Sequence, residues 1–342
     1  MSGWGVAAFL PGGNYSDPVV HLLQVQGHIM DLSEEEFQTL VQLAKRVLWT
    51  DRDTRKRLEQ QRLHITPVNF YASIPSLEDY ETSFEFREPE KTEGSYNSPT
   101  VFDIQRTKQF LSEIQQYADE FNPPLEKAAD SESVHYYWTN SSFSYMDAMS
   151  YYCILRHVKP TRVVEVGSGN STLVADMALK KNGFGEIKII EPYPLEYLKE
   201  IESVSEIIES GIQDIGFEKL RELIEAAEVL FIDSTHTVKV GSDCVYIYLK
   251  LLPRIRSNLI VHAHDIALPY AHDIKKLDIH IYWTEQYLLY AYLLDNPKTD
   301  VLTGSRYVQR LLPELSKEMM RNRFGDGGGS IWFDYRGDDG GS

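Results

Sequence analysis

Short apolar runs alternate with segments of helical periodicity throughout the second half of the chain. Five runs have the length and composition of buried strands: Arg162–Val166, Glu186–Ile190, Ser205–Ile208, Glu228–Ile232 and Asn258–His262. Helical spacing fills the segments between them: Ser171–Lys181, Leu195–Glu202, Phe217–Ala226 and Asp243–Leu252. Strands that alternate with helices of about ten residues predict a parallel sheet that is covered by helices on both faces.

The C-terminal part departs from this strict alternation. Tyr282–Leu294 predicts a strongly apolar helix, and Arg306–Arg323 is largely helical in pattern. Asp300–Thr303 and Ser330–Tyr335 predict two more strands, with the glycines of Gly325–Gly329 as a flexible link before the last one.

The first half of the chain is helical or irregular. A capped helix with one apolar stripe begins after Ser33, and two more helices are predicted at Asp103–Phe121 and Ser144–Val158. Leu63–Leu77 mixes prolines with aromatics, which fits equally a loop over a pocket or a strap packed on the core. We therefore predict that residues 1–130 form a region that caps the substrate, and that residues 131–342 form a cofactor-binding domain.

A glycine turn follows the first strand of the sheet. Gly167-Ser168-Gly169 lets a ligand approach the backbone, but a dinucleotide fingerprint needs a third glycine where this chain has Thr172. Glu165, two residues before the turn, would repel a pyrophosphate and would favour a ligand with cationic groups. Glu191 ends the second strand, where an acid accepts hydrogen bonds from ribose hydroxyls. Both kinds of cofactor use such a ribose-binding acid, so it is Glu165 that favours S-adenosylmethionine over a dinucleotide.

The segment from Glu165 to Gly169 resembles the first motif of class I S-adenosylmethionine-dependent methyltransferases. The resemblance extends over roughly Asn140 to Arg336, including a final hairpin with one antiparallel strand. It implies an α/β, doubly wound, mostly parallel seven-stranded sheet of the Rossmann-like type, here with a mainly helical N-terminal region. It also implies that Glu165, Gly167 and Gly169 line the methionine part and that Glu191 binds the ribose. Further cofactor contacts are predicted at Ser168, Ser171, Thr172, Asp214 (near the adenine amino group) and Asp233.

Three segments also look like a bacterial branch of these enzymes that acts on small molecules: IDSTHTVKVGSD, VHAHDIALP and WTEQYLL. Asn140, Phe143, Tyr145 and Asp147, just before the domain, are placed to reach the cofactor edge.

Titratable residues follow the fourth and fifth predicted strands, whose carboxyl ends meet at one edge of a parallel sheet. His264 is our first candidate for a general base, His236 the second, and Asp265 an orienting or acceptor-binding acid. The alternative is a divalent metal site built from Asp233, His236, Asp265 and one of His262 or His264. We favour the base. The following segment, Ile266–Ile281, has the length and composition of a lid.

The composition of the chain limits the kinds of molecule that we expect it to bind. The formal net charge of −17 argues against nucleic acids and anionic membranes, and hydrophobic (42%) and charged (25%) contents are typical of a globular protein. No apolar run reaches the roughly 20 residues of a membrane helix. No basic residue precedes Lys45, so we expect no secretory or transit peptide and a cytoplasmic location. Cys153 and Cys244 lie in apolar segments and are predicted to be buried thiols.

The sequence therefore predicts a methyltransferase that acts on oxygen or nitrogen of a small-molecule acceptor, of natural-product or sugar type. The sequence is compatible with a homo-oligomer. Three alternatives remain open: a metal-dependent enzyme on the same fold, an NAD-type oxidoreductase, and a non-catalytic cofactor-binding protein.

Overall fold

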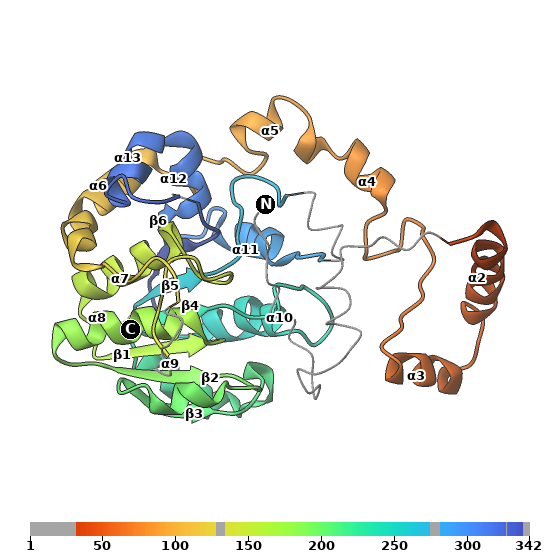
Figure 1. The fold of residues 1–342 in the computed structure, drawn as a ribbon, viewed down its shortest axis with the longest axis horizontal. Helices are drawn as coiled ribbons and strands as arrows, with labels where there is room; N and C mark the ends of the chain where they lie inside the picture. Colours follow the sequence, from red (N-terminus) through yellow and green to blue (C-terminus); the bar gives the residue numbers. More distant parts are fainter. Residues whose placement is uncertain (1–31, 128–133, 274–280, 326, 338–342) are drawn as a thin grey trace. The chain divides into compact units, whose positions relative to one another are not determined.

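The computed structural model describes residues 32–127, 134–273, 281–325 and 327–337 (Figure 1). The described residues divide into two compact units, one from Phe84 onward and the other up to Ser83. This structural division lies before the predicted one at residue 130. A capping role for the N-terminal region stays a prediction.

The larger unit is built on one seven-stranded sheet with the order β3-β2-β1-β4-β5-β7-β6. Five neighbouring strands are parallel, and β7 runs antiparallel to both β5 and β6. The strands are β1 Arg162–Val166, β2 Glu186–Ile190, β3 Val204–Ile208, β4 Val229–Ile232, β5 Leu259–Ala263, β6 Thr299–Gly304 and β7 Ile331–Tyr335. This arrangement confirms the predicted fold class.

Helices flank this sheet and precede it. They are α5 Glu90–Glu93, α6 Ile104–Ile114, α7 Met146–Val158, α8 Asn170–Asn182, α9 Phe217–Glu225, α10 Asp243–Tyr246, α11 Glu285–Leu293, α12 Ser305–Leu311 and α13 Pro313–Met319. Shorter 3-10 segments lie at Phe84–Phe86, Gln115–Glu120, Glu196–Glu200, Ile212–Asp214 and Leu252–Arg254, and a π-helical segment at Ile247–Leu251. Helix α6 packs on α7 and β6, which joins it to the sheet.

Several predicted helices are shorter or interrupted. The segment predicted as Arg306–Arg323 is two helices, because Pro313 begins α13 and cannot continue the hydrogen bonds of α12. The segment predicted at Leu195–Glu202 is a single 3-10 segment. The helix predicted from Asp243 to Leu252 stays α-helical only to Tyr246 and then widens to the π-helical segment. The positions of these helical segments were therefore predictable, whereas their type and continuity were not.

The sheet core is apolar and aromatic beneath the strand ends. Tyr151 on α7 stacks on Phe231 of β4, with ring centroids 4.7 Å apart, and Phe231 stacks on His262 of β5 at 4.0 Å. Trp332 of β7 closes this layer and is fully buried. These rings give the carboxyl ends of the central strands a rigid support.

The smaller unit contains α2 Glu34–Val47, α3 Arg52–Gln60 and α4 Leu77–Thr82. The predicted capping box of α2 is present: the Glu36 amide donates to Ser33 Oγ, and the Ser33 amide donates to the Glu36 carboxylate. Between α3 and α4 the proline- and aromatic-rich segment has no regular structure, and Phe70 and Tyr71 pack on no core within this unit. Both interpretations of that segment stay predictions.

Cys153 and Cys244 are buried free thiols, as predicted. Across the described residues, we find no helix that combines the length and the apolar character needed to cross a bilayer.

Candidate functional site

The carboxyl ends of β1, β2, β4 and β5 lie level with one another. The amide of Gly167 donates to Ile190 of β2, and the amide of Asp233 donates to Val166 of β1, at 3.0 and 2.8 Å. The amide of His264 donates to Ile232 of β4 at 2.9 Å. Ladder hydrogen bonds thus continue one residue past each strand, and they place the glycine turn beside the titratable residues, as predicted for one edge of a parallel sheet.

The glycine turn depends on a close approach between β1 and β4. Gly167 has φ +87°, and a Cβ there would lie 2.0 Å from the carbonyl oxygen of Asp233. Gly169 has φ +147° and leads directly into α8. Thr172 joins the turn to β1, because its Oγ1 accepts the Gly169 amide at 3.1 Å and donates to Glu165 Oε2 at 2.5 Å. A glycine-free turn could not occupy this position.

Glu165 lies beneath the turn and is fully buried. Tyr151 Oη donates to Glu165 Oε1 at 2.9 Å, so both carboxylate oxygens have partners. Burial raises the pKa of Glu165 to about 7, against the opposing effect of the hydrogen bonds from Thr172 and Tyr151. Glu165 therefore supports the turn, and a cation beside its buried carboxyl group would favour the ionised form.

Glu191 follows β2 and is almost fully buried. Its Oε1 accepts the Tyr193 amide at 2.9 Å. Burial and the nearby Asp233 charge raise the pKa of Glu191, while the hydrogen bond from Tyr193 opposes them. Ser171 and Thr172 are buried in the first turn of α8, whereas Asp214 is exposed at the end of its 3-10 segment. The cofactor contacts predicted for these residues stay predictions.

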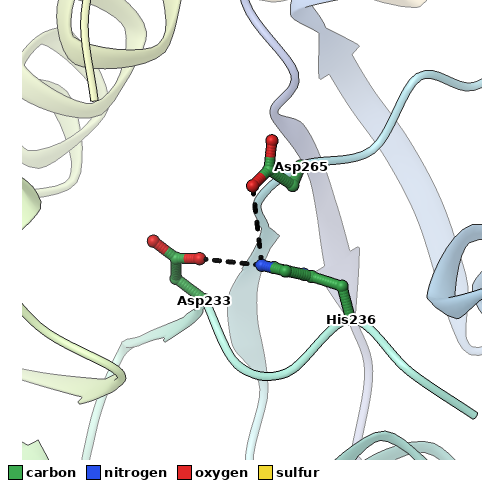
Figure 2. A group of neighbouring side chains, drawn as sticks. All are labelled: Asp233, His236 and Asp265. Atoms are coloured by element: carbon green, nitrogen blue, oxygen red, sulfur yellow. Dashed lines mark ion pairs between the residues drawn. The ribbon is translucent and has the colours of Figure 1, made fainter. Parts of the chain in front are cut away.

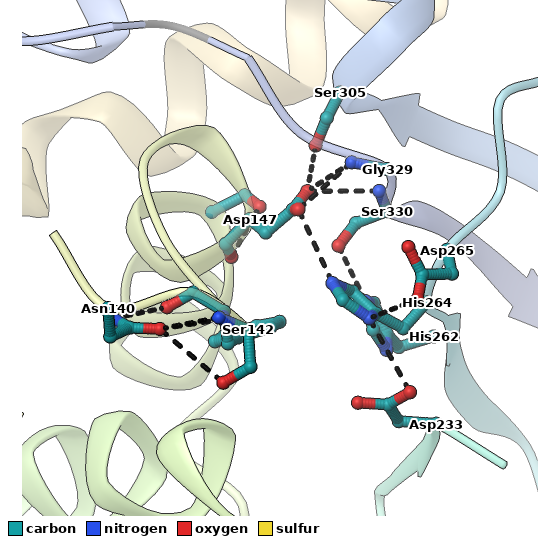
Figure 3. Close-up of polar contacts among 12 residues, drawn as sticks. Asn140, Ser142, Asp147, Asp233, His262, His264, Asp265, Ser305, Gly329 and Ser330 are labelled. Carbon is teal, nitrogen blue, oxygen red and sulfur yellow. Dashed lines mark hydrogen bonds and ion pairs between the residues drawn. The ribbon is translucent and has the colours of Figure 1, made fainter. Parts of the chain in front are cut away.

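Two histidines and two aspartates form a cluster after β4 and β5 (Figures 2 and 3). His236 Nε2 lies 3.2 Å from Asp233 Oδ1 and 3.6 Å from Asp265 Oδ2. His264 Nδ1 lies 3.5 Å from the same Asp233 oxygen and 3.8 Å from the same Asp265 oxygen. The structure therefore brings together four of the five residues that the sequence singled out for catalysis or metal binding, and His262 is the exception.

The aspartates are the accessible members of this cluster. Their side chains are 30% and 32% exposed, whereas the imidazoles of His236 and His264 are 7% and 6% exposed. Burial alone would lower the pKa of His236, but hydrogen bonds to Asp233 and Glu285 raise it to about 10. The charges of Asp233 and Asp265 likewise raise the pKa of His264 well above its usual value, against burial. The neighbouring carboxylates therefore favour the cationic form of both imidazoles in the free protein.

His262 lies outside the cluster. It is fully buried, its Nε2 lies 2.8 Å from Ser330 Oγ, and its ring packs between Phe231 and Trp332. Burial, with the nearby positive charge of His264, holds the pKa of His262 well below its usual value. Of the two histidines on β5 and its end, only His264 reaches the aspartates.

Comparison with known proteins now decides the family. A family model described as "Methyltransferase domain" matches residues 164–266, the part that contains the turn and the cluster. An uncharacterized protein of Archaeoglobus fulgidus is 33% identical over 166 residues, which cover 46% of this chain and 73% of that protein. The chain belongs to the class I S-adenosylmethionine-dependent methyltransferases.

Solved methyltransferases also match at low similarity. The O-methyltransferase TomG of Streptomyces achromogenes, involved in tomaymycin synthesis and solved with the cofactor, is 11% identical (67% of this chain, 90% of that chain, TM-score 0.33). A Podospora anserina methyltransferase solved with S-adenosylhomocysteine is 16% identical (81% of this chain, all of that chain, TM-score 0.35). Likeness at this level carries no argument about residues or substrate.

Two acids lie next to the histidines of the cluster. The sequence analysis did not single out Glu285, and it named Asp147 only for a position near the cofactor edge. Glu285, at the start of α11, lies 2.8 Å from His236 Nδ1. As the first residue of an apolar helix it resembles an ordinary helix start, and only the WTEQYLL resemblance drew attention to the segment that contains it. Asp147 contacts His264 on the side away from Asp233, 3.4 Å from its Nε2 (Figure 3), and its predicted place at the cofactor edge stays a prediction.

Asp147 ties the C-terminal hairpin to this side of the site. It accepts hydrogen bonds from Ser305 Oγ at 2.6 Å and from the amides of Gly329 and Ser330. Asn140 has a local role: its Oδ1 accepts the Phe143 amide at 2.8 Å and closes the loop before α7.

Proposed function

We propose that this methyltransferase moves a methyl group from S-adenosylmethionine to an oxygen or nitrogen of a small-molecule acceptor. The acceptor would lie over the ends of β4 and β5. The observation that carries the proposal is the continuous row formed by the glycine turn, Glu191 and the Asp233 cluster along one sheet edge.

The cofactor would lie along the first part of this row. Glu191 would accept hydrogen bonds from the ribose hydroxyls in addition to those from the Tyr193 amide and the Ser168 side chain. Glu165 and Asp233 favour the cationic ammonium and sulfonium groups, and Asp214 is exposed where the adenine amino group would lie. The amides in the first turn of α8, which have no acceptor within the helix, would supply further donors.

Methyl transfer then needs alignment and one proton acceptor. A lone pair of the acceptor atom forms the new bond to the methyl carbon, while the sulfur keeps the electron pair of the bond that breaks. The acceptor atom loses its proton to a general base. We assign that role to His236, whose distal nitrogen Nε2 faces the exposed aspartates.

His264 was our first candidate from the sequence, and the geometry supports the opposite order. Its distal nitrogen faces the buried Asp147, and the ring of Phe143 packs against it with centroids 5.1 Å apart. Only its Nδ1, next to the backbone, faces the cluster. His264 would therefore hold Asp233 in place and balance its charge.

A base must be neutral when it takes the proton. The pKa of about 10 for His236 describes the protein without cofactor. The sulfonium charge at the same edge would lower this pKa towards the neutral range, because a nearby cation disfavours the imidazolium. Cofactor binding would thereby activate the base.

A divalent cation is the second candidate use of these residues. Asp233, His236 and Asp265 each present one ligand atom, and these atoms all lie within 4.8 Å of one another. Two carboxylates and one imidazole suit a hard or borderline ion, which would supply charge to bind and acidify an acceptor hydroxyl. We keep the base as the leading proposal.

Binding and turnover test the proposal separately. Calorimetry should show S-adenosylhomocysteine binding to the wild type, and Glu191→Ala should weaken it by about 1.5–3 kcal/mol, the loss of a charge-assisted hydrogen bond. Glu191→Gln, which keeps one acceptor oxygen, is the matched control and should lose less. Radiolabelled S-adenosylmethionine with a panel of hydroxylated natural products, sugars and amines should then reveal the acceptor. Absence of binding, or equal affinity in Glu191→Ala, would contradict the cofactor assignment.

A further inference from the structure

The first turn of α11 holds the two loops that carry the cluster. The carbonyl oxygen of His236 accepts the amides of Thr284 and Glu285 at 2.9 and 3.1 Å, and the Val238 amide donates to Thr284 Oγ1 at 2.7 Å. On the other side, Gln286 Oε1 accepts the Ala267 amide at 3.1 Å. The loop after β4 and the loop after β5 are thus fastened to consecutive residues of one helix.

Glu285 adds side-chain contacts to these hydrogen bonds between the loops and α11. Its Oε2 lies 2.8 Å from His236 Nδ1, and its Oε1 accepts a hydrogen bond from Tyr248 Oη at 2.6 Å. Glu285 and Tyr248 are almost fully buried, and the Trp283 ring packs against the imidazole with centroids 4.8 Å apart. A buried carboxylate is costly unless it is paired, and here each oxygen has one specific partner.

This arrangement leaves His236 one orientation. With Nδ1–H donated to Glu285, the ring presents Nε2 between Asp233 and Asp265, where Figure 2 shows it. Rotation of the ring by half a turn about χ2 would break the contact with Glu285 and turn a carbon towards the aspartates. A carboxylate behind an imidazole is a general way to fix which nitrogen meets the substrate or metal.

We propose that Glu285 is a positioning residue that acts through His236, holding Nε2 towards the acceptor side of the site. The proposal rests on the proposed methyl transfer at this edge. It assigns the glutamate of the WTEQ segment a role in turnover, with no direct contact to cofactor or acceptor. It holds whether Nε2 receives a proton or binds a cation, because both require the same ring orientation.

Three variants test this role. Glu285→Ala removes both side-chain hydrogen bonds. Glu285→Gln keeps an oxygen for Nδ1–H and a similar shape while it removes the charge. Tyr248→Phe removes only the distant hydrogen bond and is the matched control. We expect kcat to fall about 10- to 100-fold in Glu285→Ala, with partial rescue in Glu285→Gln and near wild-type turnover in Tyr248→Phe. The KM for S-adenosylmethionine and the affinity for S-adenosylhomocysteine should stay unchanged, since the glycine turn lies on another strand.

A second readout needs no acceptor. In protein labelled with ¹⁵N-histidine, the Nδ1 proton of His236 should give a protected low-field resonance, identified by its loss in His236→Asn. We expect this resonance in the wild type and in Glu285→Gln, and its loss in Glu285→Ala. Wild-type kcat in Glu285→Ala, a resonance that survives there, or a parallel loss of cofactor affinity would overturn the proposal. If the wild type bound no S-adenosylhomocysteine, the proposed function would fail instead, while the resonance would still decide the orientation of the ring.

Discussion

Gly167 and Asp233 touch across two strands of the sheet. A Cβ on Gly167 would lie 2.0 Å from the carbonyl oxygen of Asp233, in a backbone conformation with φ +87°. The turn proposed to receive the cofactor and the first residue of the Asp233 cluster therefore share one backbone contact. A change in the turn must move Asp233 as well.

Gly167→Ala should abolish S-adenosylhomocysteine binding or prevent folding, because the methyl group overlaps backbone that a ladder hydrogen bond holds in place. Gly183→Ala is the matched control, since Gly183 has a similar φ of +82° but nothing within 4 Å of its Cβ position. The control should lose only about 1–2 kcal/mol of stability, the cost of a left-handed alanine. Urea denaturation and calorimetry would measure both; equal effects of the two substitutions would contradict the role of the contact.

The strand pattern and the glycine turn were predictable because each is local in sequence. The runs from Arg162 to Ile232 carry their own apolar pattern, and the order of acids and glycines indicated the cofactor. Parallel topology then predicts that His236 and His264 lie at one edge of the sheet. Local pattern and one topological rule were sufficient for this much.

The residues that support the site were not predictable, because their contacts are not local in sequence. Asp147 contacts His264 across more than a hundred residues of chain, and Glu285 reaches His236 from a helix whose position only tertiary packing sets. His262 is enclosed whereas His264 reaches the aspartates, and this difference also depends on packing. The strand pattern alone places both side chains on the same face. Only the position of Trp332 and Phe231 decides that His262 is enclosed.

Glu165 should make stability fall as pH rises. Its folded pKa of about 7 lies above the unfolded value of 4.5, so its contribution is fully present below the unfolded pKa and is lost as pH rises through the folded one. We expect Glu165→Gln to remove this loss, so that the variant gains relative to the wild type between about pH 5 and 8.

Urea unfolding at several pH values measures the difference between the two proteins. Glu186→Gln is a control of opposite sign. Hydrogen bonds to Ser205 and Arg162 lower the pKa of Glu186, so its contribution is present at neutral pH and is lost on acidification. A wild-type minus Glu165→Gln difference that is flat with pH would show that Glu165 stays ionised in the folded protein.

Residues 84–342 should fold and bind cofactor alone. The sheet unit begins at Phe84, and every residue of the proposed cofactor site and cluster lies within it. A shorter fragment from residue 131 should fail, because it lacks α6, whose Leu111 and Ile114 are fully buried and whose Arg106 pairs with Asp300 and Asp334. Circular dichroism and S-adenosylhomocysteine calorimetry on both fragments measure this. If the N-terminal region caps the acceptor, the 84–342 fragment should bind cofactor normally and lose turnover; full turnover would assign that region a role elsewhere.

Chelation should leave turnover intact if His236 is the base. In the free protein the cations His236 and His264 already balance Asp233 and Asp265, and a divalent ion bound by His236 would have to displace its proton. The base predicts a rate that rises with pH through one histidine-like pKa and is indifferent to a chelator such as EDTA. The metal predicts activity that is lost to the chelator and restored by one of Mg²⁺, Mn²⁺ or Zn²⁺.

Asp233→Asn and Asp265→Asn sharpen the contrast between base and metal, because both remove a ligand and should be equally severe for a metal site. For the base, Asp233→Asn should be the more severe, since Asp233 lies closer to His236 and also contacts His264. Full inhibition by chelator, reversed by a single divalent ion, would overturn the assignment of His236 as the base and leave it as a metal ligand.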